Sequence, residues 1–144
     1  MMAVGNWVFP DMPPLEGLCL ASYYAGIRTG TAPDTVLITL PDTTTTTAVF
    51  TQNAFAAAPV SVGRAHLAKT HRIKGLLINA GNANAATGDA GVTHANQCCQ
   101  AMASVLACKA HQILPLSTGV VGEPLPVDNI IQAIPELVNS LGEH

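Results

Sequence analysis

The stretch "IKGLLINAGNANAATGDAG", residues 73–91, joins a nearly continuous apolar run to a turn of asparagines, glycines and alanines. The apolar run at 73–81 predicts a central β-strand that is covered on both faces. The turn at 79–91 contains no strong nucleophile or base. We therefore expect its asparagines to adopt left-handed or Asx-turn conformations and to bind neighbouring backbone, which is a structural role.

The residues that follow this turn repeat with the period of an α-helix. Apolar side chains recur at steps of three and four: Val92, Ala95, Cys99, Met102 and Leu106. This pattern predicts an amphipathic helix at about 89–108. Thr87 or Asp89 is expected to cap its N-terminus.

Strand patterns lie on both sides of this unit. Apolar and β-branched runs predict strands at 18–24, 35–40 and 112–122. Threonine favours an extended backbone, so the Thr-rich continuation of the second strand predicts a hairpin over 35–52. A glycine turn is expected to end the last strand.

Two further helices complete the predicted fold. One is expected at 60–70 after a proline, and the other follows an apolar stripe from Val127 onward, where Pro135 either kinks the helix or starts a second one. Strands that alternate with helices predict an α/β sandwich. We expect a single domain over residues 1–144, with 1–17 as an irregular N-terminal segment.

The composition points to a partner protein rather than to nucleic acid. Apolar residues make up 49% of the chain and charged residues only 10%, so part of the surface is expected to be buried against a partner chain. Six basic and nine acidic residues give a net charge of −3, which provides no electrostatic footprint for DNA or RNA.

Cysteine usage and the N-terminus predict a cytoplasmic protein. The four cysteines show no CxxC spacing and are expected to be buried thiols in a reducing compartment: Cys19, Cys98, Cys99 and Cys108. The first 17 residues lack the basic and apolar regions of a secretory signal. No apolar run approaches the roughly 18 residues that a membrane span requires, so we expect no membrane contact.

The turn at 79–91 also allows a non-catalytic function. Backbone N–H groups at a helix N-terminus attract anions, so the turn resembles a phosphate-binding loop in outline. The alternative function is therefore an α/β domain that binds a nucleotide or a coenzyme A phosphate. The turn lacks the glycine and lysine spacing of dinucleotide and nucleoside-triphosphate sites, which weakens this interpretation.

Other chemistry-bearing residues give weaker signals. One group of basic residues is compatible with an anion site, but a solvated helix face explains it more simply: Arg64, His66, Lys69, His71, Arg72 and Lys74. His94 and Cys98 lie four residues apart without a third ligand at a suitable spacing, so no metal site is predicted. No cofactor is expected either.

The stretch "LSTGVVG", residues 116–122, carries the strongest catalytic signal. The hydroxyl of Thr118 and the backbone N–H of Gly119 give two adjacent donors at the mouth of a strand, which is the geometry that stabilises an oxyanion in acyl transfer. A plain exit from strand to loop also fits this stretch. A nucleophilic role for Ser117 or Thr118 is disfavoured because the G-x-S-x-G motif is absent.

Four separated segments resemble one family, the ornithine acetyltransferases, also called glutamate N-acetyltransferases. They are "AGIRTGTAPDTVLI", "AVFTQNAFAAAPV", "LLINAGNANAATGDAG" and "LSTGVVGEPLPVDNI", and the resemblance extends from about residue 17 to 134. It implies a mixed-sheet sandwich similar to the N-terminal-nucleophile hydrolases. It also implies that Thr118 and Gly119 form the oxyanion hole.

The family's activity requires a second polypeptide. Its members are precursors that cleave themselves before a threonine, which becomes the N-terminal nucleophile of a β chain. That threonine takes an acetyl group from N-acetylornithine and passes it to glutamate in arginine biosynthesis, and some members also accept acetyl-CoA. The resemblance implies that this chain is the N-terminal part of an α chain. It would then pair with a β chain in the cytoplasm and assemble as a heterotetramer of α–β pairs.

Overall fold

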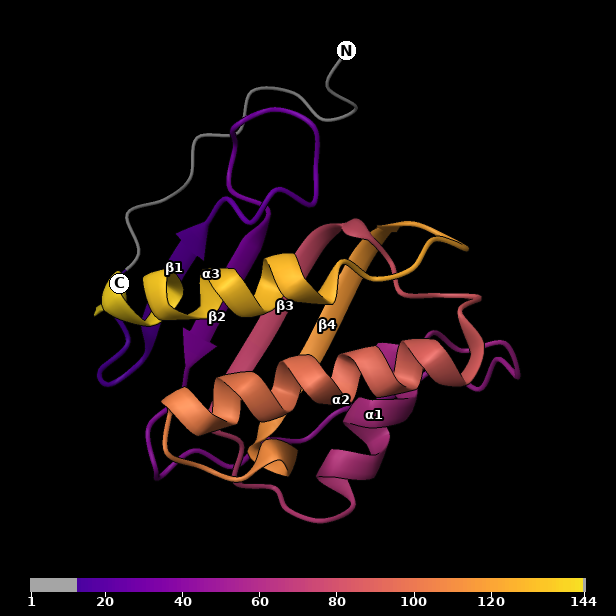
Figure 1. Cartoon of the computed structure of the whole chain (residues 1–144). Helices are drawn as coiled ribbons and strands as arrows, with labels where there is room; N and C mark the ends of the chain where they lie inside the picture. Colours follow the sequence, from indigo (N-terminus) through magenta and orange to yellow (C-terminus); the bar gives the residue numbers. More distant parts are fainter. Residues whose placement is uncertain (1–12, 144) are drawn as a thin grey trace, which may run out of the picture.

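The computed structural model describes residues 13–143, which form one mixed sheet with helices packed on it (Figure 1). The elements in chain order are β1 (Cys19–Tyr23), β2 (Thr35–Thr39), α1 (Ala58–Leu67), β3 (Gly75–Asn82), α2 (Gly88–Val105), a 3₁₀ turn η1 (Ala110–Gln112), β4 (Ile113–Val120), α3 (Val127–Asn139) and β5 (Gly142–Glu143). Of the predicted irregular segment, residues 1–12 lie outside the described part, and 13–18 form no strand. None of the described helices is long and apolar enough to cross a membrane.

The sheet has the strand order β4-β3-β2-β1-β5. β3 and β4 run parallel and are joined through α2, whereas the other neighbouring strands pair antiparallel. Both pairing directions occur in one sheet, so the predicted mixed α/β architecture is confirmed. The parallel pair matters most for function, because it brings the ends of β3 and β4 to the same edge of the sheet.

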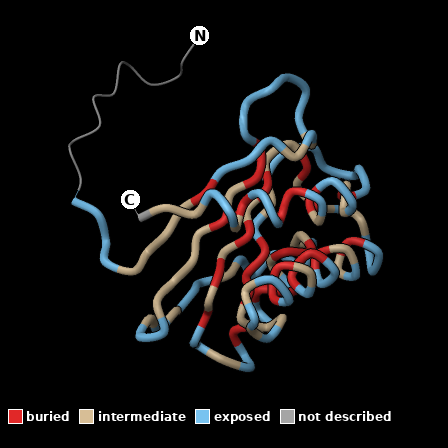
Figure 2. The backbone as a smooth tube through the Cα atoms, turned by 60° about the vertical axis from the view of Figure 1, so that its left-hand side comes forward, coloured by how far each residue is buried: buried red, intermediate tan, exposed pale blue. Residues whose placement is uncertain are grey.

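One face of the sheet is covered by α2 and α3 and holds the main core (Figure 1). Leu37, Leu77 and Ile113 belong to this core and are at most 4% exposed. Met102 of α2 and Leu137 of α3 pack into the same cluster and are fully buried. Figure 2 shows the buried residues gathered where these helices meet the strands.

The opposite face of the sheet, which we call the open sheet face, carries aliphatic side chains that the described helices leave partly uncovered. Side chains alternate along a strand, so the neighbours of the core residues point to this second face. They are Leu20, Val36, Ile38, Leu76, Ile78 and Leu116. Five of them are half-buried and Leu116 is 42% exposed. On this face Leu76 packs against a second, smaller core that contains Leu67 of α1 and Leu114, so the expectation that β3 is covered on both faces is confirmed only in part.

The predicted hairpin over 35–52 is also wrong. β2 pairs with β1 on one side and with β3 on the other, so neither of its edges is free for the Thr-rich segment. Residues 40–53 instead form an irregular segment outside the sheet. The hairpin that does form joins β1 to β2 through the loop at 24–34.

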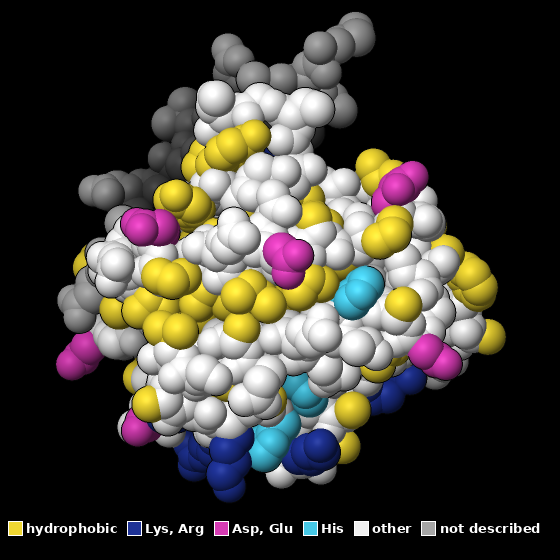
Figure 3. Space-filling model, in the orientation of Figure 1, with side chains coloured by type: hydrophobic (Ala, Val, Ile, Leu, Met, Phe, Trp, Pro, Cys, Tyr) yellow, Lys and Arg dark blue, Asp and Glu magenta, His cyan; other side chains and the backbone are white. Residues whose placement is uncertain are grey.

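Basic side chains hold this Thr-rich segment against the body of the protein. The Arg72 guanidinium donates hydrogen bonds to three consecutive carbonyls, those of Asp42, Thr43 and Thr44. Lys74 forms an ion pair with the Asp42 carboxylate. These contacts give two members of the basic group a structural role. Figure 3 shows most of the visible Lys and Arg side chains at the lower edge of the molecule.

Arg64 fastens the other end of the same segment. Its guanidinium donates to the carbonyl of Thr51 over 2.9 Å and lies 5.4 Å from the centre of the Phe50 ring. His66, by contrast, is buried and bonds through Nδ1 to the carbonyl of Ile113. The basic group is therefore dispersed over several backbone contacts and does not converge on one anion site.

The three helices differ from the sequence predictions at a start, at a cap and at an internal proline. α1 begins at Ala58, before the predicted start, because a proline fits the first turn of a helix. Thr87 occupies the N-cap position of α2, but its hydroxyl bonds elsewhere and makes no cap. Pro135 lies inside α3, so the alternative in which it starts a second helix is wrong.

Truncation of a fully buried leucine at the centre of the sheet tests this core. We expect Leu37→Ala to lower the free energy of unfolding by about 3 kcal/mol, because it removes apolar contacts and leaves a cavity between β2 and the helices. Val105→Ala is the control, since Val105 is 47% exposed at the end of α2. Urea denaturation measures both, and equal losses would contradict the described core.

The loop between β1 and β2 is organised by one buried carboxylate. Asp34 accepts hydrogen bonds from the backbone N–H groups of Ala25, Ile27 and Arg28, at 2.7–3.0 Å, and from the hydroxyl of Thr35. Burial by itself raises the pKa of this carboxyl, but the hydrogen bonds outweigh burial, so the pKa of Asp34 lies below its usual value.

The lowered pKa of Asp34 predicts how the stability of the fold changes in acid. A carboxyl with a lower pKa in the folded state stabilises the fold above its unfolded pKa, and this contribution is lost as pH falls through the folded pKa. We therefore expect Asp34→Asn to destabilise the protein at pH 7, with the difference from wild type shrinking below about pH 4. Denaturation curves at several pH values measure this difference. A constant difference down to pH 2.5 would show that the charge of Asp34 is not responsible.

Candidate functional site

The candidate site lies where β3 and β4 end side by side. Thr118 is paired with Ala80 and Asn82 of β3, and Gly119 lies opposite Gly81. Thr118 is exposed. The alternation along β4 places its side chain on the same face as Leu116, at the end of the open sheet face. Its hydroxyl makes no hydrogen bond to any residue within 13–143. The first predicted donor is thus available to a ligand.

Gly119 lies in a contact that only glycine permits. Its φ is +135°, and a Cβ there would overlap the backbone of Gly81 and lie 2.5 Å from the backbone nitrogen of Asn82. The facing Gly81 also has a positive φ, of +111°, and the pairing register shifts between Gly81 and Asn82. The two backbones therefore meet at a β-bulge directly beside Thr118.

Buried amides tie the turn after β3 to β4. Asn79 accepts a hydrogen bond from the Ser117 hydroxyl over 2.6 Å and donates one to the carbonyl of Asn82 over 2.8 Å. Asn82 donates in turn to the carbonyls of Glu123 and Pro124, in the chain that leaves β4. The sequence pattern raised Ser117 only as a nucleophile and did not indicate its contact with Asn79. Parallel pairing of the two strands, which places Asn79 opposite Ser117, is the signal that would have found it.

A third asparagine ties the turn to α2. Asn84 is fully buried, has a φ of +46°, and donates to the carbonyl of Gly91 while accepting from the Thr87 hydroxyl. The expectation of left-handed, backbone-binding asparagines is thus confirmed for Asn84, and its neighbours use their side chains in the same way. Asp89 stands in the first turn of α2 and places a negative charge where a phosphate would bind. This arrangement disfavours the phosphate interpretation of the turn.

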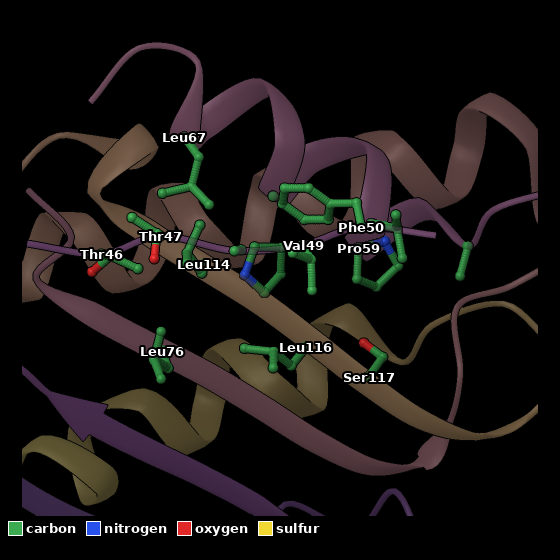
Figure 4. Close-up of a pocket in the computed structure, with 15 residues that line it drawn as sticks. Thr46, Thr47, Val49, Phe50, Pro59, Leu67, Leu76, Leu114, Leu116 and Ser117 are labelled. Atoms are coloured by element: carbon green, nitrogen blue, oxygen red, sulfur yellow. The ribbon is translucent and has the colours of Figure 1, made fainter. Parts of the chain in front are cut away.

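An apolar pocket of about 450 Å³ opens on the sheet beside the candidate site (Figure 4). It lies between the Thr-rich segment, α1 and the strands β3 and β4, and its lining includes Thr46, Thr47, Val49, Phe50, Pro59, Leu67, Leu76, Leu114, Leu116 and Ser117. The pocket is continuous with the open sheet face through Leu76 and Leu116. Ser117, which belongs to the lining, directly precedes Thr118 in β4.

The thiol of Cys98 lines a small internal cavity together with Asn79 and Ser117, on the core side of the sheet. Cys98 and Cys99 are buried, whereas Cys19 and Cys108 are half-buried, and all four are free. Burial raises the pKa of the Cys98 thiol to about 12, so it remains protonated near neutral pH. Within residues 13–143, no three His, Cys, Asp or Glu side chains are placed to hold a metal ion.

Comparisons with known proteins find one family of similar sequences and structures. The model of the ArgJ family matches residues 19–144. The arginine biosynthesis bifunctional proteins ArgJ of Neisseria meningitidis serogroup A and Methylococcus capsulatus are each 43% identical to the chain, over 88% and 90% of it. The chain spans only 31% of the length of these relatives.

Solved structures share the fold. The ornithine acetyltransferase of Mycobacterium tuberculosis, in complex with ornithine, aligns with a TM-score of 0.83 at 29% identity, over 88% of this chain and 68% of that one. The ArgJ protein of Bacillus halodurans aligns with a TM-score of 0.78 at 29% identity, over 83% and 62%. The family resemblance drawn from four sequence segments is confirmed. Since the family model covers nearly the whole described structure, the chain belongs to the ArgJ family.

Proposed function

We propose that the chain is the N-terminal part of the α chain of an acetyltransferase, and that Thr118 and Gly119 form its oxyanion hole. The observation that carries this proposal is the free hydroxyl of Thr118 at the exposed end of β4. The next residue is Gly119, where the close approach of the β3 backbone leaves no room for a side chain. The reaction is the transfer of an acetyl group from N-acetylornithine to glutamate in arginine biosynthesis. Ornithine in the Mycobacterium tuberculosis structure supports this substrate class.

Acetyl transfer of this kind passes through anionic intermediates. A threonine hydroxyl of the partner attacks the acetyl carbonyl of N-acetylornithine, the C–N bond breaks, and ornithine leaves with the proton. The amino group of glutamate then attacks the resulting ester and releases the threonine hydroxyl. Each step forms a tetrahedral oxyanion, and the Thr118 hydroxyl and the Gly119 N–H would donate hydrogen bonds to it.

The open sheet face supports a partner polypeptide. Six aliphatic side chains on four adjacent strands are only partly covered, and the pocket beside α1 extends this apolar surface. Burying apolar surface contributes about 25 cal/mol per Å², so a second sheet packed here would bind with a strong driving force. The relatives are about three times as long as the aligned segment, which provides enough polypeptide to form such a sheet.

The partner in this proposal is a β chain from the same precursor, with the nucleophilic threonine at its N-terminus after self-cleavage. Packing against the open sheet face would place the β chain beside Thr118, because Thr118 lies at the end of that face, and the proposal puts its N-terminal threonine there. The α–β pairs would assemble further, as a heterotetramer in the cytoplasm. Acetyl-CoA is a possible second acetyl donor in this scheme.

Purification from the native organism tests the proposal directly. A tagged chain should copurify with a polypeptide whose first residue is threonine, as N-terminal sequencing and intact mass would show. The complex should transfer acetyl from N-acetylornithine to glutamate. A complex without a threonine-initiated chain and without acetyl transfer would refute the proposed function.

Thr118→Ala tests the oxyanion hole within that complex. We expect kcat to fall by about 10²–10³-fold with little change in KM, because the lost hydrogen bond forms only in the transition state. Thr118→Ser is the matched control, since it keeps the hydroxyl and should retain most of the activity. Steady-state kinetics measure both variants, and an unchanged kcat in Thr118→Ala would remove this residue from the oxyanion hole.

A further inference from the structure

We propose that Asn79 is a positioning residue for the oxyanion hole, acting through Ser117. This inference rests on the proposed function, because it assumes that Thr118 and Gly119 bind the oxyanion. Asn79 itself faces the helices and is 5% exposed, so it does not reach the reacting atoms. Its side-chain amide holds both strands that meet at the site.

The amide of Asn79 uses both of its ends. The oxygen Oδ1 accepts from the Ser117 hydroxyl of β4, and the nitrogen Nδ2 donates to the carbonyl of Asn82 in the β3 bulge. Ser117 directly precedes Thr118, and Asn82 is paired with Thr118 from the other strand. One buried side chain therefore fixes the residue before Thr118 and the backbone opposite it.

This fixation is needed because the neighbouring contact is made by glycines. Gly119 allows the two backbones to approach closely, and neither Gly119 nor the facing Gly81 has a side chain that would resist sliding or rotation. Hydrogen bonds inside a low-dielectric interior are strong and directional, so the Asn79 amide supplies the missing restraint. Asn82 adds a second restraint beyond the site by donating to the carbonyls of Glu123 and Pro124.

A restraint of this kind affects the transition state more than the bound substrate. An oxyanion hole stabilises charge only when both donors point to one position, and small displacements weaken it. Loss of the Ser117–Asn79 hydrogen bond should therefore lower kcat and leave KM nearly unchanged. A purely structural role would instead lower the unfolding temperature and the amount of folded enzyme, with kcat per folded molecule unchanged.

The test compares two variants of nearly equal shape in the assembled enzyme. Ser117→Val removes the hydroxyl, and Ser117→Thr keeps it on a side chain of the same volume. We expect Ser117→Val to lower kcat by roughly tenfold, because the buried Asn79 oxygen loses its donor, and Ser117→Thr to stay within about threefold of wild type. Thermal unfolding of both variants confirms that folded enzyme is being compared.

A double-mutant cycle shows whether Ser117 acts through Thr118. In the Thr118→Ala background, Ser117→Val should lower kcat by clearly less than in the wild-type background, because the donor that it positions is already absent. Asn84→Gly is the matched control, because it removes another buried side-chain amide of the same turn. Glycine tolerates the positive φ at this position. The side-chain hydrogen bonds of Asn84 join it to Gly91 and Thr87 and not to β4. This variant should lower stability and leave kcat unchanged.

The outcomes separate this inference from the proposed function. An unmodified complex that transfers no acetyl group overturns both. An active complex in which Ser117→Val and Ser117→Thr have equal kcat overturns the positioning role alone. Fully additive losses in the double-mutant cycle also overturn it, because they would show that Ser117 and Thr118 act independently.

Discussion

The close contact between the backbones of Gly81 and Gly119 is the constraint on which the rest of the site depends. It joins two parallel strands at a β-bulge, and no side chain of any size fits between them. Beyond this point β4 stays paired with the turn after β3, because the N–H of Ala83 donates to the carbonyl of Val120 and the N–H of Gly122 donates to the carbonyl of Ala85. The direction of β4 at its end is thus set by backbone packing and not by the surface loop that follows.

Around this contact, hydrogen bonds from buried asparagines hold the chain segments together, whereas apolar packing holds them together elsewhere in the core. Each one satisfies several backbone groups in a turn that has little regular secondary structure, and each unmet group would cost free energy in the interior. Asn79 and Asn82 connect the turn to β4, and Asn84 connects it to α2. Their directional bonds specify one arrangement, whereas apolar packing alone would tolerate several.

The sequence predicted the unit from β3 to β4 well because its signals are local. The apolar run, the asparagine turn and the periodic helix each follow from residues close together in the chain. The Thr-rich segment was assigned wrongly because its extended propensity is local, while its exclusion from the sheet depends on β2 already having two partners. The Asn79–Ser117 bond was missed for a similar reason: it joins residues 38 positions apart. The open sheet face was foreseeable in part, since strands that are apolar on both faces need two covering layers.

Because the open sheet face is only partly covered, the stability of the fold would depend on the concentration of a polypeptide that binds there. Any polypeptide that binds only the folded chain adds its free energy of association to the stability of the fold, by mass action. If the proposed partner covers this face, the melting temperature of the chain becomes a property of the mixture and rises with the partner's concentration. Dilution alone would weaken the fold, even though every contact within the chain stays the same.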